Sequence, residues 1–317
     1  MSKDRQYKVF EQYFSKPLKT SHGTWSNRST LVLRERRENA EIRYGEVAPT
    51  PGFTDYKIND LMEDAKIWAG GHEVSDDSPL NCALSCMDSI IWNRDFSSEL
   101  EYIHSSKFFS HIEEIGNENI TLKKKIGLLP TDQEIKETIN WIHQLPESAK
   151  VRLDPNQSLD FPGLLKWVKA LEGENRLEFI EEPFGSLKLD ELIELVDNQP
   201  VRIALDESVV ACGGPKKLYE MGWSGCFVIK PTLLEDWDET INFIKQNPTK
   251  SVISTVFESP FGYEAVIRCS GYSKRVPGLE RAVLRKSAGE LIEHHTAPLK
   301  IPSLKISQLN ELWKKIP

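Results

Sequence analysis

From about residue 120 onward, short apolar runs rich in β-branched residues alternate with longer amphipathic segments. The runs are TLKKKIG, VRLDPN, LEFIEEP, VRIALDES, CFVIKP and SVISTVF. Between them, apolar residues recur every three or four positions, which is typical of helices that cover a sheet. Repeated strand and helix units in this order predict a parallel sheet.

Four of these units carry clear helix patterns. The first helix is predicted to begin at Thr131, with a capping box formed by Thr131 and Glu134, and to turn Ile135, Ile139 and Ile142 towards the sheet. Further helices are predicted from about residues 160, 187 and 235. Four consecutive units are the core of a barrel.

Residues 1–98 have a different pattern. STLVLRERR and AEIRYGEVAP favour antiparallel strands, whereas INDLMEDAKIWAG and SPLNCALSCMDSIIW favour helices. We therefore expect an α+β domain over residues 1–98 and a barrel over residues 99–285. The segment 286–317 has no further clear strand and helix pair, and we expect it to close the barrel and return to the first domain.

Charge and composition narrow the function classes. The 317 residues contain 40 Lys and Arg against 48 Asp and Glu, a net charge of −8, and no basic block interleaved with aromatics. This argues against nucleic acid as a partner and favours an enzyme of small molecules. No apolar stretch reaches membrane-spanning length, the N-terminus is charged, and the five cysteines are scattered, so we expect a cytoplasmic protein with reduced thiols.

Five charged residues stand at the C-terminal ends of successive apolar runs: Lys125, Asp154, Glu181, Asp206 and Lys230. Their spacings of 29, 27, 25 and 24 residues correspond to one strand and helix unit each. In a closed barrel all five would therefore meet over the C-terminal mouth. For any single one of them a solvated loop or a helix cap is an equally good explanation, but five at one period indicate a site.

Three carboxylates from neighbouring strands repel one another unless a cation lies among them. Oxygen ligands without a His or Cys cluster favour Mg²⁺, with Mn²⁺ as a substitute. Lys125 and Lys230 would come from strands on either side of the three carboxylates and face each other across a metal-bound substrate. A lysine beside a metal and a second ammonium can serve as a general base.

This ordered set resembles the enolase superfamily in its muconate-lactonizing branch, and within that branch the o-succinylbenzoate synthases. The resemblance spans nearly the whole chain. It rests on Lys123-Lys124-Lys125, Asp154-Pro155-Asn156, Ile180-Glu181-Glu182-Pro183, Ala204-Leu205-Asp206-Glu207-Ser208 and Val228-Ile229-Lys230-Pro231, with Tyr44 to Pro49 and the Val252 to Gly262 region in support.

The resemblance implies a modified TIM barrel, (β/α)₇β, with an N-terminal α+β capping domain. It implies that Lys125 is the acid and base and Lys230 the opposing cation. It also implies that Asp154, Glu181 and Asp206 ligate Mg²⁺, which acts on a small carboxylate substrate.

Five further residues are implied to bind substrate or support the site: Lys123, Arg152, Asn156, Ser254 and Thr255. Alternation places Arg152 on the same face as Asp154, and either substrate orientation or pairing with a ligand carboxylate would suit it. Glu182 and Glu207 are expected to point away from the site. His22, in the loop from Thr20 to Trp25, is a candidate substrate contact, although a single histidine in a loop is more often only exposed to solvent.

The implied reaction is the syn dehydration of 2-succinyl-6-hydroxy-2,4-cyclohexadiene-1-carboxylate to o-succinylbenzoate, a step of menaquinone biosynthesis. Racemisation of N-acylamino acids or epimerisation of dipeptides uses the same two-lysine core and stays open, although the Asp-x-Asp pair typical of dipeptide epimerases is missing near residues 255–262. A barrel that binds without turnover, and a Schiff base at Lys230, are the alternatives of other classes.

Overall fold

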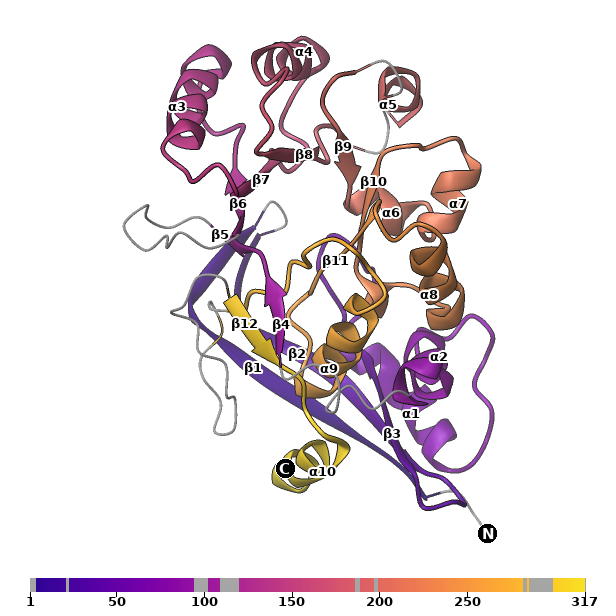
Figure 1. Cartoon of the computed structure of the whole chain (residues 1–317). Coiled ribbons are helices and arrows are strands. Elements are labelled where there is room, and N and C mark those ends of the chain that lie inside the picture. Colours follow the sequence, from indigo (N-terminus) through magenta and orange to yellow (C-terminus); the bar gives the residue numbers. More distant parts are fainter. Residues whose placement is uncertain are drawn as a thin grey trace.

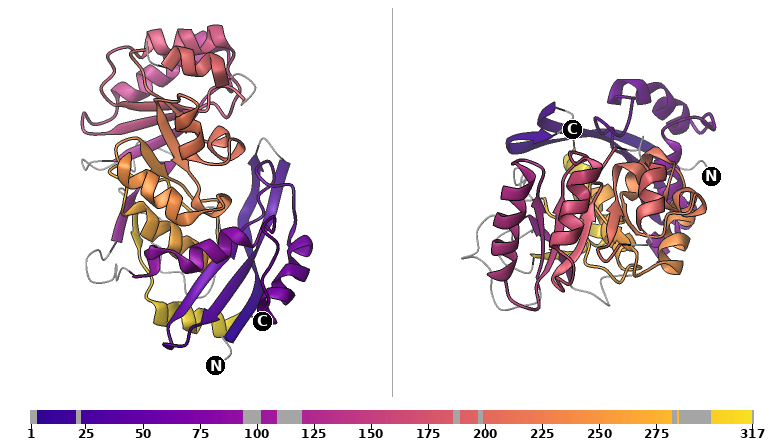
Figure 2. Two further views of the ribbon diagram at one scale, coloured as in Figure 1. Left: turned by 90° about the vertical axis from the view of Figure 1, so that its right-hand side faces the viewer. Right: turned by 90° about the horizontal axis from the view of Figure 1, so that it is seen from above.

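The computed structural model describes residues 4–20, 23–93, 102–108, 120–185, 189–196, 199–281, 284 and 299–316. It has two parts, an antiparallel sheet with its helices and a parallel barrel-like sheet with helices outside it (Figure 1). Seen from the side, the long strands of the first part form a layer alongside the second (Figure 2). We refer to the first part as the cap and to the second as the barrel.

The cap sheet has the order β1-β2-β3 and is antiparallel throughout. Its strands are β1 (Asp4–Thr20), β2 (Gly23–Arg36) and β3 (Ile42–Val47), followed by the helical segments η1 (Ile58–Leu61), α1 (Met62–Ala69), α2 (Asn81–Asp88) and η2 (Ile90–Asn93). The two strands and the helical segments predicted for this region are confirmed. Strand β1 was not predicted.

Both faces of β2 are buried at residues 30–33, which explains the apolar run Leu31-Val32-Leu33. Leu31 and Leu33 pack into the cluster formed with α1 and α2, whereas Val32 belongs to the core shared with the barrel. Gly45 of β3 lies so close to α2 that a Cβ atom there would overlap the carbonyl oxygen of Ala83. The cap sheet therefore lies between its own helices and the barrel.

The barrel strands form one parallel sheet in the order β11-β10-β9-β8-β7-β6-β5. Its elements are β5 (Lys107–Phe108), β6 (Thr121–Lys125), α3 (Thr131–His143), β7 (Lys150–Asp154), α4 (Phe161–Ala170), β8 (Leu177–Glu181), α5 (Leu189–Val196), β9 (Ile203–Leu205), α6 (Glu207–Ala211), α7 (Pro215–Glu220), β10 (Cys226–Ile229), η6 (Pro231–Leu233), α8 (Trp237–Gln246), β11 (Ser251–Ile253) and α9 (Pro260–Ser270). The expected irregularity near residues 108–121 falls mostly outside the described residues.

The four predicted helices are present as α3, α4, α5 and α8, but the predicted capping box is wrong. The residue before α3 is Pro130, and the Glu134 carboxylate accepts hydrogen bonds from Gly127 N at 2.6 Å and Leu128 N at 3.0 Å. Glu134 thus ties the helix start to the strand end before it. The short helices α6 and α7 between β9 and β10 were not predicted.

The two edges of the barrel sheet are joined by the segment around Pro277 and Gly278. Ser106 N donates to Pro277 O at 2.8 Å, and Gly278 N donates to Ile253 O at 2.8 Å. Residues 277–278 therefore bridge β11 and the chain just before β5.

The described part of the C-terminal segment contacts the start of the barrel and the cap. β12 (Leu299–Pro302) pairs with β4 (Tyr102–Ser105), and Trp313 of α10 (Ile306–Lys315) lies 6.0 Å from Tyr44 and 5.9 Å from Phe261 between ring centroids. None of the helices in the described ranges is long and apolar enough to cross a bilayer.

Candidate active site

A cavity of about 440 Å³ lies over the C-terminal ends of the barrel strands and is covered by the cap. Eight of the ten predicted site residues line it: Lys123, Lys125, Asp154, Asn156, Asp206, Lys230, Ser254 and Thr255. They come from β6, β7, the end of β9, the end of β10 and the segment after β11. The strand-end spacing thus predicted side chains that do converge.

Alternation along β6 separates its three lysines. Lys123 and Lys125 face the cavity, whereas Lys124 lies on the outer side with its Nζ 5.5 Å from the centre of the Trp141 ring of α3. The cation–π contact accounts for a lysine that faces the helix layer. On the inner side, Lys123 Nζ lies 2.8 Å from Asp154 Oδ2 and 2.7 Å from Glu181 Oε1.

The three predicted metal ligands are almost fully buried, with exposed fractions of 3% for Asp154, 2% for Glu181 and 6% for Asp206. Glu181 does not line the cavity but lies beneath Lys123. Burial, with repulsion from Asp154 and Asp206, raises the pKa of Glu181 to about 8. For Asp154, burial opposes ionisation, yet the Lys123 ammonium lowers its pKa below the usual value.

The donor set fits a hard divalent cation by its chemistry, because all three groups are buried carboxylates that already attract a cation, Lys123, between two of them. As placed, the described residues contain no three Asp, Glu, His or Cys side chains arranged as a finished metal site. Asp206 is instead ion-paired with Lys230. Metal binding would require the two lysine ammoniums to share or release these carboxylates.

The two predicted catalytic lysines differ in their surroundings. Lys230 is buried, forms its ion pair with Asp206, and has its Nζ 4.3 Å from the centre of the Phe53 ring. Burial disfavours its charge, but Asp206 and Glu207 outweigh burial and raise the pKa of Lys230. Lys125 is exposed to the cavity and, among the described residues, makes no ion pair. Lys230 is therefore held as a cation by its carboxylate partners, whereas Lys125 has no ion-pair partner among the described residues.

Three predicted substrate contacts form hydrogen bonds at the rim of the barrel. Asn156 has a left-handed φ of 46° and donates its N–H to Asp154 Oδ1 at 3.0 Å. Ser254 Oγ donates to Gly278 O at 3.3 Å, and the Thr255 hydroxyl donates to the Glu258 carboxylate. Each of the three lines the cavity.

Arg152 is placed away from the cavity. Its Nε donates to Glu178 Oε2 at 2.7 Å, and Arg275 Nη1 binds the other oxygen of Glu178 at 2.6 Å. Arg152 therefore pairs with a carboxylate inside the barrel that is not one of the predicted ligands, and it does not contact the cavity. The pairing of β7 with β8 shifts register between Val151 and Arg152, next to Glu178, and the local pattern did not reveal this irregularity.

The two glutamates next to ligands behave differently from each other. Glu182 points away as expected and accepts hydrogen bonds from Asp206 N at 2.7 Å and Ser208 N at 3.3 Å. Glu207 lines the cavity, so the expectation that it points away is wrong. Strand alternation does not apply to it, because β9 ends at Leu205 and Glu207 is the first residue of α6.

The sequence pattern also missed the apolar wall of the cavity. The cap contributes Leu18, Trp25, Pro51 and Phe53, and the segment after β11 contributes Val256 and Phe257. These residues lie in loops and strand ends whose apolar character carries no period, so no local signal distinguishes them. The candidate His22 lies outside the described residues.

The chain is similar to known proteins in its sequence. The family described as Enolase C-terminal domain-like matches residues 113–244. The o-succinylbenzoate synthase of Thermosynechococcus vestitus is 26% identical over 280 residues, which cover 82% of this chain and 86% of the relative. That of Pectobacterium atrosepticum is 26% identical over 308 residues, which cover 90% and 92%.

Solved structures share the fold. The crystal structure of o-succinylbenzoate synthase from Thermosynechococcus elongatus, with magnesium in its active site, superimposes with a TM-score of 0.76 at 21% identity and covers 98% of this chain and 99% of its own. L-Ala-D/L-Glu epimerase from Bacillus subtilis gives a TM-score of 0.70 at 15% identity, covering 95% of each chain. In sequence and in fold, the chain is thus similar to enzymes of the enolase superfamily.

Proposed function

We propose that the protein is a Mg²⁺-dependent o-succinylbenzoate synthase, which converts 2-succinyl-6-hydroxy-2,4-cyclohexadiene-1-carboxylate into o-succinylbenzoate and water in menaquinone biosynthesis. The observation that carries the proposal is the convergence of Lys125, Lys230 and the carboxylate cluster on one cavity in a chain that matches named synthases over most of its length.

Lys125 is the group suited to move protons. Its amine takes the proton from the ring carbon that bears the carboxylate, and the resulting ammonium gives a proton to the hydroxyl that leaves from the adjacent carbon as water. A syn elimination needs the proton and the hydroxyl on one face, so one lysine serves both steps. The ring becomes aromatic, which makes the elimination favourable.

Lys230 faces the substrate from the opposite side as a permanent cation. The carboxylates of Asp206 and Glu207 keep it charged in spite of its burial, so its role is to stabilise negative charge that develops on the substrate. Asp154, Glu181 and Asp206 would hold the Mg²⁺. When bound, Mg²⁺ supplies further positive charge next to the substrate carboxylate.

The wall of the cavity suits a cyclic, largely carbon substrate. Leu18, Trp25 and Phe53 from the cap and Phe257 from the barrel present apolar surface opposite the charged strand ends. A flat ring can pack against these side chains while its carboxylate faces the lysines.

The assay is the appearance of the aromatic product from the cyclohexadiene substrate, followed by ultraviolet absorbance. We expect turnover by the purified protein, loss of turnover in EDTA, and recovery when excess Mg²⁺ is added. Lys125→Met should be inactive. Lys124→Met is the matched control and should retain activity, because Lys124 contacts Trp141 outside the barrel. Turnover that survives both EDTA and Lys125→Met would refute the proposal.

Epimerisation of a dipeptide is the competing activity within this superfamily. The segment after β11, Thr255-Val256-Phe257-Glu258, offers no pair of carboxylates to a substrate ammonium, because Glu258 is fully buried and accepts hydrogen bonds from Thr232 Oγ1 at 2.7 Å and Val256 N at 3.1 Å. Exchange of the α-proton of dipeptides or N-acylamino acids in deuterated water, in the absence of dehydration, would favour the competing activity.

A further inference from the structure

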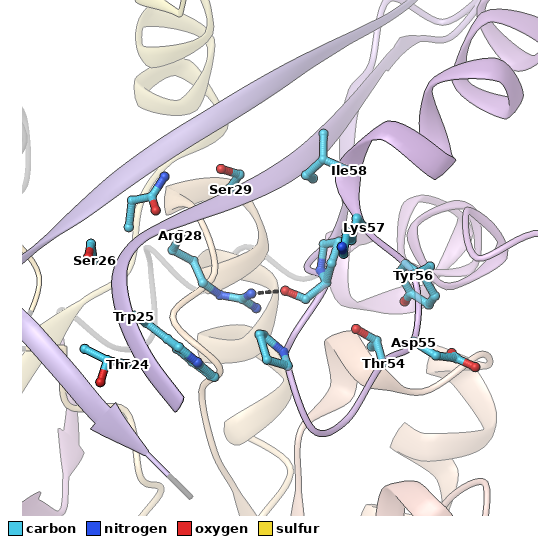
Figure 3. Close-up of a pocket in the computed structure, with 13 residues that line it drawn as sticks. Thr24, Trp25, Ser26, Arg28, Ser29, Thr54, Asp55, Tyr56, Lys57 and Ile58 are labelled. Atoms are coloured by element: carbon cyan, nitrogen blue, oxygen red, sulfur yellow. Dashed lines mark hydrogen bonds between the residues drawn. The ribbon is translucent and has the colours of Figure 1, made fainter. Parts of the chain in front are cut away.

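Arg28 of β2 is a buried arginine at the junction of the cap and the barrel, with an exposed fraction of 4%. Its guanidinium donates to four acceptors: Ala48 O at 3.0 Å, Pro49 O, Thr50 Oγ1 at 2.6 Å and Val256 O at 3.1 Å. Figure 3 shows Arg28 between Trp25 and the loop that carries Thr54 and Tyr56, with one of these hydrogen bonds drawn. Three acceptors belong to the cap loop and one to the barrel.

Among the described residues Arg28 has no carboxylate within ion-pair distance, so its charge is satisfied by main-chain carbonyls and one hydroxyl. Burial lowers the pKa of Arg28 to about 10, partly offset by Glu258 and Glu46, and the group therefore stays charged at neutral pH. A buried guanidinium is costly to desolvate unless its donors are used. A leucine or methionine would fill the same space without that cost. The presence of an arginine is therefore explained by the hydrogen bonds that it makes.

The two segments that Arg28 joins form opposite parts of the active-site wall. The loop after β3 contributes Thr50, Pro51 and Phe53, and the segment after β11 contributes Thr255 and Val256. The catalytic lysines and the carboxylates lie instead on strand ends that Arg28 does not touch. Arg28 therefore fixes the distance between the two walls and leaves the reacting groups to the barrel strands.

Two more buried side chains of the cap sheet bind the same barrel segment. Gln12 of β1 donates its amide to Phe257 O at 3.1 Å and Glu258 O at 3.0 Å, and Glu46 of β3 accepts from Ser259 N at 2.8 Å. Phe257 has a left-handed φ of 62°, which is unfavourable for a bulky residue unless its surroundings impose it. Each cap strand thus contributes one polar side chain that holds the segment 256–259.

We propose that Arg28 is a positioning residue for substrate binding, which fixes the cap loop 48–53 against the barrel segment 254–258, with Gln12 supporting the barrel side. This inference rests on the proposed function only for the identity of the substrate. The expected consequence of its loss is weaker substrate binding with the chemical step largely intact.

Arg43 provides a matched control. It is a buried arginine of the same sheet that donates to Met87 O at 3.1 Å and Ser89 O at 3.2 Å, both outside the active-site wall. We compare Arg28→Met and Arg28→Lys with Arg43→Met in two measurements. The first is hydrogen–deuterium exchange of the main chain without substrate, and the second is steady-state kinetics of dehydration.

Arg28→Met should speed exchange in segments 48–54 and 254–262 and leave β7 to β9 unchanged. It should raise KM about tenfold to a hundredfold and change kcat by less than about threefold. Arg28→Lys, which keeps the charge and some donors, should fall between Arg28→Met and the wild type. Arg43→Met should show neither the local exchange nor the KM change, even where it lowers the thermal midpoint.

If Arg28→Met does not fold, Gln12→Glu takes its place, because it keeps the acceptor for Arg281 and removes both donors to the 257–258 carbonyls. It should speed exchange in segment 254–262 and raise KM as Arg28→Met does, with segment 48–54 less affected because Gln12 binds only the barrel side. Unchanged exchange in both segments, or equal effects of Arg28→Met and Arg43→Met, would overturn the inference. The wild-type protein could also lack dehydration activity while Arg28→Met still speeds exchange in the two segments. That result would support the positioning role of Arg28 and count against the proposed function alone.

Discussion

Glu46 allows a quantitative test of how the cap is attached to the barrel. Its carboxylate is fully buried and accepts hydrogen bonds from Ser259 N at 2.8 Å, Gly262 N at 2.9 Å and the Ser259 hydroxyl, all at the start of α9. A helix start favours a negative charge, whereas burial opposes one. The perturbation is Glu46→Gln, which keeps the shape and one acceptor but cannot ionise.

Burial has the largest effect on the pKa of Glu46. Together with repulsion from Glu258, burial outweighs the hydrogen bonds from Ser259 and Gly262 and raises the pKa of Glu46 from 4.5 to about 6. One pKa unit corresponds to about 1.4 kcal/mol, so ionised Glu46 should make the folded protein about 2 kcal/mol less stable than protonated Glu46 does. Because the folded pKa is raised, this stability is fully present below about pH 4.5 and is lost as the pH rises through about 6.

The assay is urea unfolding of the wild type and of Glu46→Gln at several pH values between 4.5 and 8. Other groups also titrate, but they contribute equally to both proteins, so the difference between the two free energies of unfolding isolates Glu46. Its hydrogen-bond changes add an offset that does not depend on pH. Relative to Glu46→Gln, the wild type should lose about 2 kcal/mol between pH 4.5 and 8.

A flat difference would show that Glu46 ionises as easily in the folded protein as in the unfolded chain. A difference of opposite sign, with the wild type gaining stability as the pH rises, would show that the donors of α9 outweigh burial. Either result would refute the balance of forces inferred at this junction.

Three further predictions test the site and the cap. In steady-state assays, Lys125→Arg should lower kcat about a hundredfold to ten-thousandfold because a guanidinium does not release its proton readily, whereas Lys230→Arg should retain more activity than Lys230→Ala. Calorimetric titration with Mg²⁺ should show weaker binding for Glu181→Gln than for Glu182→Gln, and equal losses would mean that the wrong glutamate of the pair was assigned. Gly45→Ala should destabilise the protein by about 1–3 kcal/mol in thermal unfolding, since its methyl group would overlap the main chain of α2, and an unchanged midpoint would contradict that packing.

The sequence predicted the barrel and the converging strand ends because both depend on local rules. A strand end is visible where an apolar run stops, and Asp154 or Lys230 at that place needs no knowledge of distant residues. The same rule was wrong for Glu207, because β9 is only three residues long and the chain turns into α6 before the glutamate. Alternation is informative only inside a strand, and the sequence does not mark the residue at which a short strand ends.

The contacts that couple the cap to the barrel depend on a different kind of information. Gln12, Arg28 and Glu46 stand in three strands and bind one segment more than 200 residues away, so no window of sequence contains both partners. Arg152 shows the same limit, because alternation placed it on the inner face but only the fold brings Glu178 between Arg152 and Arg275. The groups proposed for chemistry are fixed by the strands that carry them, whereas the shape of the substrate wall is fixed by side chains of another domain. Substitutions in the cap can therefore change which substrate fits without altering the strand ends that hold Lys125, Asp154 and Lys230.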